Sequence, residues 1–203
     1  MGQQVSQGIG FSRVGLIGAV AICLILAAAL TRSAIDYFEE QRVERATADA
    51  VRIANAVIRF HRDVGLWPVA LDRSAPIDRL VTSAHLARGA GAGAGAGAAN
   101  WGDYGQAVQL GKFLYDPSDA ADPTSGAIWR GPYLDEFSIS DPWGNAYVIN
   151  SRYLPRGKYA GKIRHKVLVL SPGPDQKWQT PYSDAATEDT HGDDIAELIY
   201  VTN

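Results

Sequence analysis

The chain has 203 residues and a formal net charge of −3, so it offers one modest domain with extensions and no broad basic surface for nucleic acid. Its only cysteine is Cys23, which excludes an intramolecular disulfide. An exported domain of this kind must be stable without a disulfide, which raises the value of a metal ion that closes a loop.

An uncharged apolar run extends from Val14 to Leu30, close to the lower limit of about 17 residues for a membrane-spanning helix. The sequence therefore predicts a transmembrane helix over residues 11–30, preceded by a candidate leader over residues 1–10. A cleaved secretory signal peptide is the alternative, with the alanines at 27–29 as its cleavage site. The short tail before the run and the large polar part after it favour a single span with the domain outside.

Residues 31–65 are predicted to continue the helix as a stalk, because no proline or glycine occurs between Thr31 and Asp63. Apolar residues at helical spacing predict one packing face. That face comprises Ala46, Ala50, Ile53, Ala54, Val57 and Ile58. Gly65 and Pro68 predict where the helix ends. We expect its first half to suit lipid and its second half to pack against a small domain.

Residues 66–130 read as a variable loop region, with one short helix predicted over Ile77–Leu86. Residues 89–99 alternate glycine and alanine, which predicts a flexible segment, with a silk-like sheet as the alternative. Residues 100–130 are polar and rich in turn signals.

Residues 131–203 contain short β-branched and apolar runs bounded by turn signals. Strands are predicted over Ala146–Ser151, His165–Leu170 and Leu198–Val201. Three antiparallel strands against a long amphipathic helix define an α+β fold.

A turn is predicted at Asp141-Pro-Trp-Gly-Asn, because Asp accepts hydrogen bonds from nearby amides and Gly144 can adopt a positive φ. Trp143 is then expected to pack over the helix. Stacking of a sugar on Trp143 or Trp178 is the alternative for these aromatic side chains.

Three carboxylates surround a C-terminal loop: Asp175 follows the turn after one predicted strand, and Asp193 and Asp194 precede the next. Carboxylates are the ligands that a hard cation such as calcium prefers. Because calcium takes six to eight oxygens, backbone carbonyls near Leu170 and Ser171, together with loop carbonyls or water, are expected to complete the shell. The alternative is an acidic loop that is merely solvated.

Four motifs in order carry a family resemblance. They are Gly10-Phe11 before the apolar run, Phe60 to Pro68 at the helix exit, Trp129 to Leu134 with Asp141 to Tyr147, and Ser171 to Asp175 with Gly192 to Ile195. The layout resembles type IV pilin-like proteins, and most closely the major pseudopilin of type II secretion systems. It departs from that pattern at Gly15, where the family usually has Glu, and in a leader without Lys or Arg.

The resemblance implies a structural subunit rather than an enzyme. It implies prepilin processing between Gly10 and Phe11, a calcium loop, a single-pass inner-membrane location and a periplasmic domain. The implied partners are further copies in a homo-oligomeric filament, other pilin-like subunits and secretion-platform membrane proteins. The alternative is a membrane-anchored periplasmic binding or enzymatic domain that stays monomeric. No P-loop, dinucleotide-binding or zinc signature occurs in the sequence.

Overall fold

The computed structural model describes residues 13–70, 77–83, 101, 107–116, 129–155, 165–182 and 190–201. The candidate leader, the processing pair Gly10 and Phe11, and the glycine-alanine segment lie outside these residues. The chain divides into two compact units, Met1–Gln41 and Arg42–Asn203, which are described one at a time.

The first unit contains the N-terminal part of helix α1, whose full extent is Arg13–Val64. Large apolar side chains in this part are between 51% and 70% exposed from Leu16 to Leu26. Within the described part of the chain, none of the helices has the length and the hydropathy that crossing a membrane requires. The span predicted over residues 11–30 stays a prediction.

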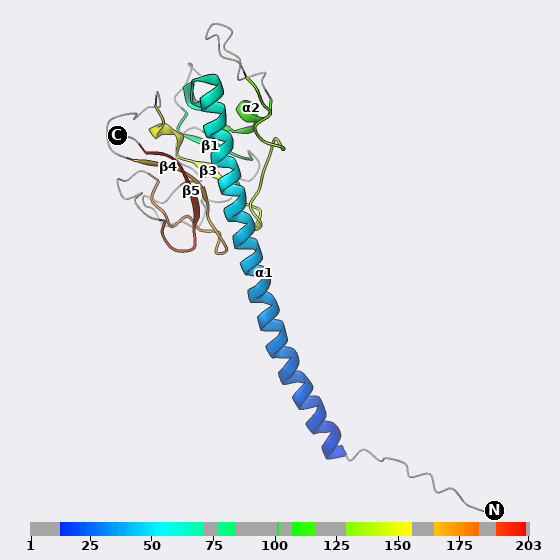
Figure 1. The fold of residues 1–203 in the computed structure, drawn as a ribbon. Coiled ribbons are helices and arrows are strands. Elements are labelled where there is room, and N and C mark those ends of the chain that lie inside the picture. Colours follow the sequence, from blue (N-terminus) through cyan, green and yellow to red (C-terminus); the bar gives the residue numbers. More distant parts are fainter. Residues whose placement is uncertain are drawn as a thin grey trace, which may run out of the picture. The chain divides into compact units, whose positions relative to one another are not determined.

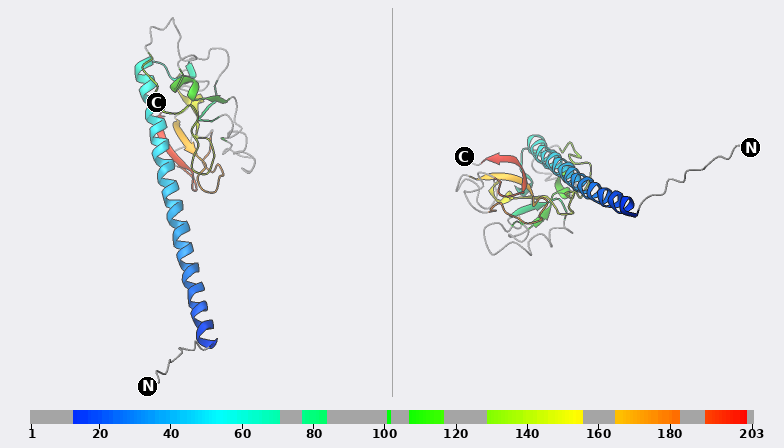
Figure 2. Two further views of the ribbon diagram at one scale, coloured as in Figure 1. Left: turned by 90° about the vertical axis from the view of Figure 1, so that its right-hand side faces the viewer. Right: turned by 90° about the horizontal axis from the view of Figure 1, so that it is seen from below.

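In the second unit, the C-terminal part of α1 lies along the sheet (Figure 1 and Figure 2). Its buried face comprises Ala46, Ala50, Ile53, Ala54, Ala56, Val57, Phe60 and Val64. The predicted packing face is thus confirmed except at Ile58, which is 39% exposed. One residue after Val57 turns the helix by about 100°, which carries Ile58 away from the sheet.

Helix α1 ends where the sequence predicts. Gly65 has a φ of +75°, and its amide donates to the carbonyl of His61 at 2.8 Å. This left-handed cap satisfies one of the last helical carbonyls. Pro68 then opens the short 3₁₀ helix η1, Pro68–Ala70.

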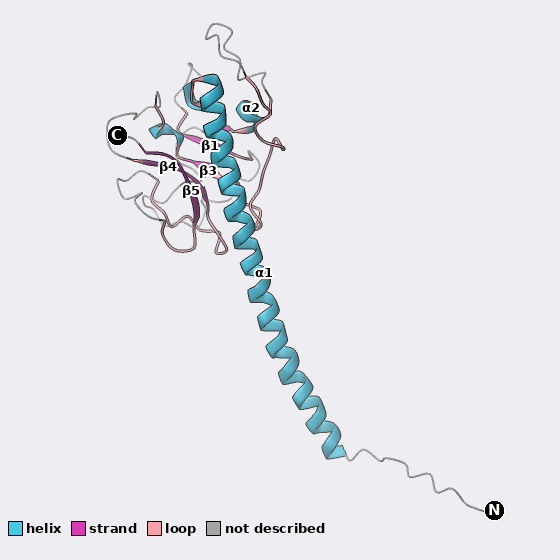
Figure 3. Cartoon of the chain, in the orientation of Figure 1, coloured by secondary structure: helices cyan, strands magenta, loops and turns pink. Residues whose placement is uncertain are grey.

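The described residues of the second unit form one five-stranded sheet in the order β2-β1-β3-β4-β5. Figure 3 shows the strands in magenta. The strands are β1 (Arg79–Val81), β2 (Ala107–Gln109), β3 (Val148–Ile149), β4 (Lys166–Ser171) and β5 (Ile195–Val201). The β1–β2 pair is parallel and the other pairs are antiparallel. The α+β class is confirmed, but the predicted sheet of three antiparallel strands was too small.

Strand β1 lies inside the segment predicted as a helix over Ile77–Leu86, so that prediction was wrong. The segment is buried, and the charged side chain of Asp78 lies 3.5 Å from the Nε of Arg152. Arg152 belongs to the 3₁₀ helix η2, Ser151–Tyr153. Pairing of β1 with the distant strands β2 and β3 therefore overrides the local helical pattern.

Strand β2 and helix α2 (Gly111–Leu114) were also missed, since the polar sequence around them reads as loop. The β3 strand is shorter than the predicted Ala146–Ser151, and β5 begins at Ile195, three residues before the predicted Leu198. The β4 strand matches its prediction to within one residue at each end.

Candidate functional site

The turn after β4 brings the chain back toward β5. Gly173 has a φ of +66°, and a Cβ there would collide with the carbonyl oxygen of Asp193. The amide of Gln176 donates to the carbonyl of Gly173 at 3.2 Å and closes the turn. Glycine is therefore required at position 173 both for the backbone angle and for the close approach of the two loops.

The loop before β5 lies against the segment that follows this turn. The Asp193 amide donates to Oε1 of Gln179 at 2.8 Å, and the His191 amide donates to Oγ1 of Thr180 at 3.0 Å. Gly192 has a φ of +65°, and a Cβ at this position would overlap the Gln179 side chain. Residues 172–180 after β4 and residues 190–194 before β5 thus pack against each other, and we call these two segments the loop pair.

The adjacent carboxylates of Asp193 and Asp194 each accept hydrogen bonds through one oxygen within the loop pair. The Asp175 amide donates to Oδ2 of Asp193 at 2.9 Å. Oδ2 of Asp194 accepts from the amides of Gln179 at 3.0 Å and Thr180 at 2.5 Å. Both side chains therefore turn back onto the 175–180 segment, and the structure brings the three predicted aspartates into one loop pair.

The other oxygen of each carboxylate is left without a hydrogen bond. Oδ1 of Asp193 and Oδ1 of Asp194 are buried and have no partner among the described residues. Burial raises the pKa of Asp194, the hydrogen bonds from Thr180 and Gln179 lower it, and the charge of Asp193 raises it further. A buried acceptor without a donor is costly, so these two atoms offer positions for a cation or a further donor.

Asp175 differs from these two residues because its carboxylate is already occupied. Oδ1 accepts from the Lys177 amide at 2.8 Å, and Oδ2 accepts from Nε2 of Gln179 at 2.9 Å. The Lys177 ammonium also lies 3.8 Å from Oδ2. Each oxygen of Asp175 therefore already has a donor, and a cation bound there would share that oxygen with it.

The two predicted carbonyl ligands lie in strand β4. Leu170 and Ser171 are fully buried and are paired in register with Ala196 and Ile195 of β5. Ser171 is therefore held beside the residue that follows Asp194. No group of three or more His, Cys, Asp or Glu side chains in the described ranges is arranged to hold a metal ion. The expected metal loop is thus not supported as a set of three carboxylates.

A contact that the sequence did not predict joins this loop pair to the Asp141 turn. Oδ2 of Asp141 accepts from the Ser171 hydroxyl at 2.6 Å. The same hydroxyl oxygen accepts from the Gly173 amide at 3.2 Å. Ser171 therefore connects a buried carboxylate, 4% exposed, to the turn that precedes Asp175.

The Asp141 turn itself has the predicted geometry. Oδ1 of Asp141 accepts from the amides of Trp143 at 3.1 Å and Asn145 at 2.6 Å, and Gly144 has a φ of +93°. Trp143 is half-buried, whereas Tyr147 is fully buried and its hydroxyl donates to the Ala46 carbonyl of α1 at 3.4 Å.

Trp178 is a core residue. It is 2% exposed and its ring stacks on Trp101 at a centroid distance of 6.1 Å. This burial excludes the sugar-stacking alternative for Trp178 in the folded domain.

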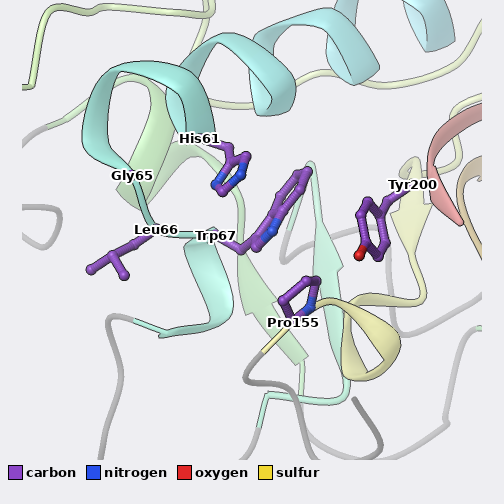
Figure 4. Close-up of a pocket in the computed structure, with 6 residues that line it drawn as sticks. All are labelled: His61, Gly65, Leu66, Trp67, Pro155 and Tyr200. Atoms are coloured by element: carbon purple, nitrogen blue, oxygen red, sulfur yellow. The ribbon is translucent and has the colours of Figure 1, made fainter. Parts of the chain in front are cut away.

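A separate cavity of about 290 Å³ lies at the end of α1, where only the end of a helix was predicted (Figure 4). It is lined by His61, Gly65, Leu66, Trp67, Pro155 and Tyr200. His61 stacks on Trp67 with centroids 3.9 Å apart, and Trp67 lies 5.5 Å from the Tyr200 ring. Its volume is close to the lower end of the range of about 300–1,000 Å³ for small-molecule sites.

Comparison of the chain with protein-family models, curated proteins and solved structures finds no match.

Proposed function

We propose that this chain is a structural subunit of a pilin-like filament, a pseudopilus that serves type II protein secretion. The observation that carries the proposal is the apolar surface of the first unit. The exposed side chains are Leu16, Ile17, Val20, Ile22, Leu24, Ile25 and Leu26. At 100° per residue these positions surround the helix rather than form one stripe. A helix that is apolar on all sides needs an apolar environment, either lipid or neighbouring helices.

A filament subunit needs both environments in turn. Before assembly the apolar part of α1 lies in the inner membrane, with the second unit in the periplasm. After assembly the same side chains pack against the helices of neighbouring copies and of other pilin-like subunits. The order of the four sequence motifs supports this assignment, and their resemblance to pseudopilins supplies the role in secretion. The proposed partners are therefore further copies, other pilin-like subunits and the secretion-platform membrane proteins.

We also propose that the loop pair between β4 and β5 binds calcium. The two buried, unpaired oxygens of Asp193 and Asp194 support this proposal, since each is an acceptor that a cation can occupy. Backbone carbonyls near Leu170 and Ser171, the Asp175 carboxylate and water would supply the remaining oxygens. Bound calcium would neutralise neighbouring carboxylates and join the two loops, which stabilises the folded domain.

Disulfide crosslinking in membranes tests the filament proposal. Cys23→Ser gives a cysteine-free chain, in which single cysteines replace residues 16–26 one at a time. Packed neighbouring helices should give homotypic crosslinks that vary with helical periodicity. A matched control is Lys112→Cys, which is exposed on helix α2 of the second unit. Crosslinks at no position, or equally at every position including the control, would rule out specific packing of these helices.

The cavity at the end of α1 favours a second candidate, a membrane-anchored periplasmic binding domain that remains monomeric. Native sizing in mild detergent distinguishes the two candidates. The filament proposal predicts oligomers that depend on residues 16–26, whereas the binding-domain candidate predicts a monomer at all concentrations. A monomer that also lacks crosslinks in membranes would favour the binding domain.

A further inference from the structure

Asp141 and Ser171 are 30 residues apart in sequence but share a short hydrogen bond, at 2.6 Å. Both are buried, with Asp141 4% exposed and Ser171 fully covered. The Ser171 hydroxyl has one proton, and this contact directs that proton to Asp141. The oxygen lone pairs of Ser171 then face the Gly173 amide, which donates to them at 3.2 Å.

The hydrogen bond between the Gly173 amide and the Ser171 hydroxyl affects the position of the aspartates. Its Cα lies so close to the Asp193 carbonyl that a Cβ would collide with it. Two residues later the Asp175 amide donates to the Asp193 carboxylate at 2.9 Å. The position of the Gly173 amide therefore sets how the turn meets Asp193, and the Ser171 hydroxyl anchors that amide.

Asp141 is itself held in place by further donors from its own turn. The amides of Trp143 and Asn145 donate to its Oδ1, and the Asn145 side chain donates to Oδ2 at 3.2 Å. Its carboxylate is thus fixed within the turn before β3, and it can orient Ser171 without moving.

We propose that Asp141 is a positioning residue for the cation site, acting through the Ser171 hydroxyl on the turn that carries Asp175 to Asp193. The inference rests on the proposed calcium binding and adds a residue that has no direct contact with the ion. Groups that orient metal ligands from outside the ligand shell typically change affinity by about 10–100-fold when they are removed.

This role is tested by titrating the full-length chain in detergent with calcium and measuring the Kd by calorimetry. Ser171→Ala retains the carbonyl but removes the hydroxyl, and Asp141→Asn removes the acceptor for that hydroxyl. Each should raise the calcium Kd about tenfold. The double variant should bind no more weakly than the weaker single variant, because both changes break the same connection.

Asn145→Ala is the matched control. It removes a side-chain donor from the same carboxylate while retaining the Ser171 contact, so calcium affinity should change by less than about twofold. Tryptophan fluorescence without calcium establishes that each variant is folded at the titration temperature. If Ser171→Ala is unfolded at that temperature, the calcium Kd of Asp141→Asn is compared with that of Ser171→Thr, which retains a hydroxyl.

The outcomes separate the two proposals. A wild-type chain that binds no calcium overturns the cation site and the positioning role together. A wild-type chain that binds calcium, with Kd unchanged in Ser171→Ala and Asp141→Asn, overturns the positioning role alone. An equal loss in Asn145→Ala would assign the effect to general weakening of the turn and also overturn the role of Ser171.

Discussion

Asp141 and Asp194 are both buried aspartates in turns that meet through Ser171, but their hydrogen bonding differs. Asp141 is 4% exposed, and both of its oxygens accept hydrogen bonds, from two amides and from the Ser171 hydroxyl. Asp194 is 7% exposed, and only one of its oxygens accepts, from two amides. Its other oxygen has no partner in the described residues.

The comparison separates a completed structural turn from an incomplete site. Burying a carboxylate is unfavourable unless the protein supplies compensating donors. The described residues supply them fully at Asp141 but only in part at Asp194, where burial raises the pKa above its ordinary value. We infer that the first carboxylate organises the fold, whereas one oxygen of the second has no donor among the described residues.

Asp141→Ala should have the largest effect on stability. It removes the acceptor of the Trp143 and Asn145 amides and of the Ser171 hydroxyl, so the free energy of unfolding should fall by about 3–5 kcal/mol. Urea denaturation followed by tryptophan fluorescence measures this loss. Asp135→Ala is the control, because that side chain is 86% exposed and pairs only at the surface with Arg52. Its cost should be under about 1 kcal/mol. Equal costs in the two variants would contradict a structural role for Asp141.

Calcium should have the next largest effect. At a hundredfold excess over Kd, binding to the folded state alone contributes about 2.7 kcal/mol. Millimolar calcium should therefore raise the melting temperature of the full-length chain in detergent, and a chelator should reverse the rise. Magnesium should do much less, because it demands a smaller octahedral shell.

The double variant Asp193→Ala, Asp194→Ala tests where that calcium response originates. It should abolish the response, whereas Glu197→Gln, a charge change within β5, should retain it. A melting temperature indifferent to calcium and chelator in the wild-type chain would show that the loop pair binds no calcium. The filament proposal would be unaffected by that result.

Local signals in the sequence were enough to predict the helix, its C-terminal end and the Asp141 turn. The spacing from Ala46 to Val57 defines a buried face, and Gly65 supplies the left-handed cap. The Asp141 turn is equally local, because its donors lie two and four residues away. These features depend on residues within one or two turns of the chain, so a pattern can predict them.

Features that depend on distant partners could not be predicted. Strands β1 and β2 have three residues each and pair in parallel, which leaves too short a pattern to detect. The three aspartates were predicted to share one loop, and they do. The sequence could not tell that Asp175 is occupied by Gln179, or that Asp141 reaches Ser171. Those distinctions arise only when separate turns are packed together.

Substituting glycine in the two turns compares their geometry directly. Gly144 and Gly173 both have positive φ, but a Cβ at 144 meets nothing within 4 Å, whereas one at 173 collides with the Asp193 backbone. Gly144→Ala should therefore cost about 1 kcal/mol from backbone strain alone, and Gly173→Ala about 2–3 kcal/mol. Urea denaturation of both variants measures the difference. Equal costs would mean that the loop before β5 moves aside easily.

Tyr147→Phe should have the smallest effect at neutral pH and a distinct dependence on alkaline pH. The variant loses one hydrogen bond to the Ala46 carbonyl, which costs about 0.5–1.5 kcal/mol. In the wild-type chain, burial raises the pKa of Tyr147 strongly, and the charges of Asp49 and Asp141 raise it further.

The sign of the alkaline effect follows from the two states. The unfolded chain releases the phenol proton near pH 10, while the folded chain retains it, so rising pH favours unfolding. Wild-type stability should fall by up to about 1.4 kcal/mol per pH unit above pH 10 from this residue, and Tyr147→Phe lacks that loss. The stability gap between the two proteins should therefore close between pH 10 and 11 in urea denaturation. A gap that stays constant across this range would show that Tyr147 ionises equally in both states. The contact between the Tyr147 hydroxyl and the Ala46 carbonyl of α1 would then be open to solvent.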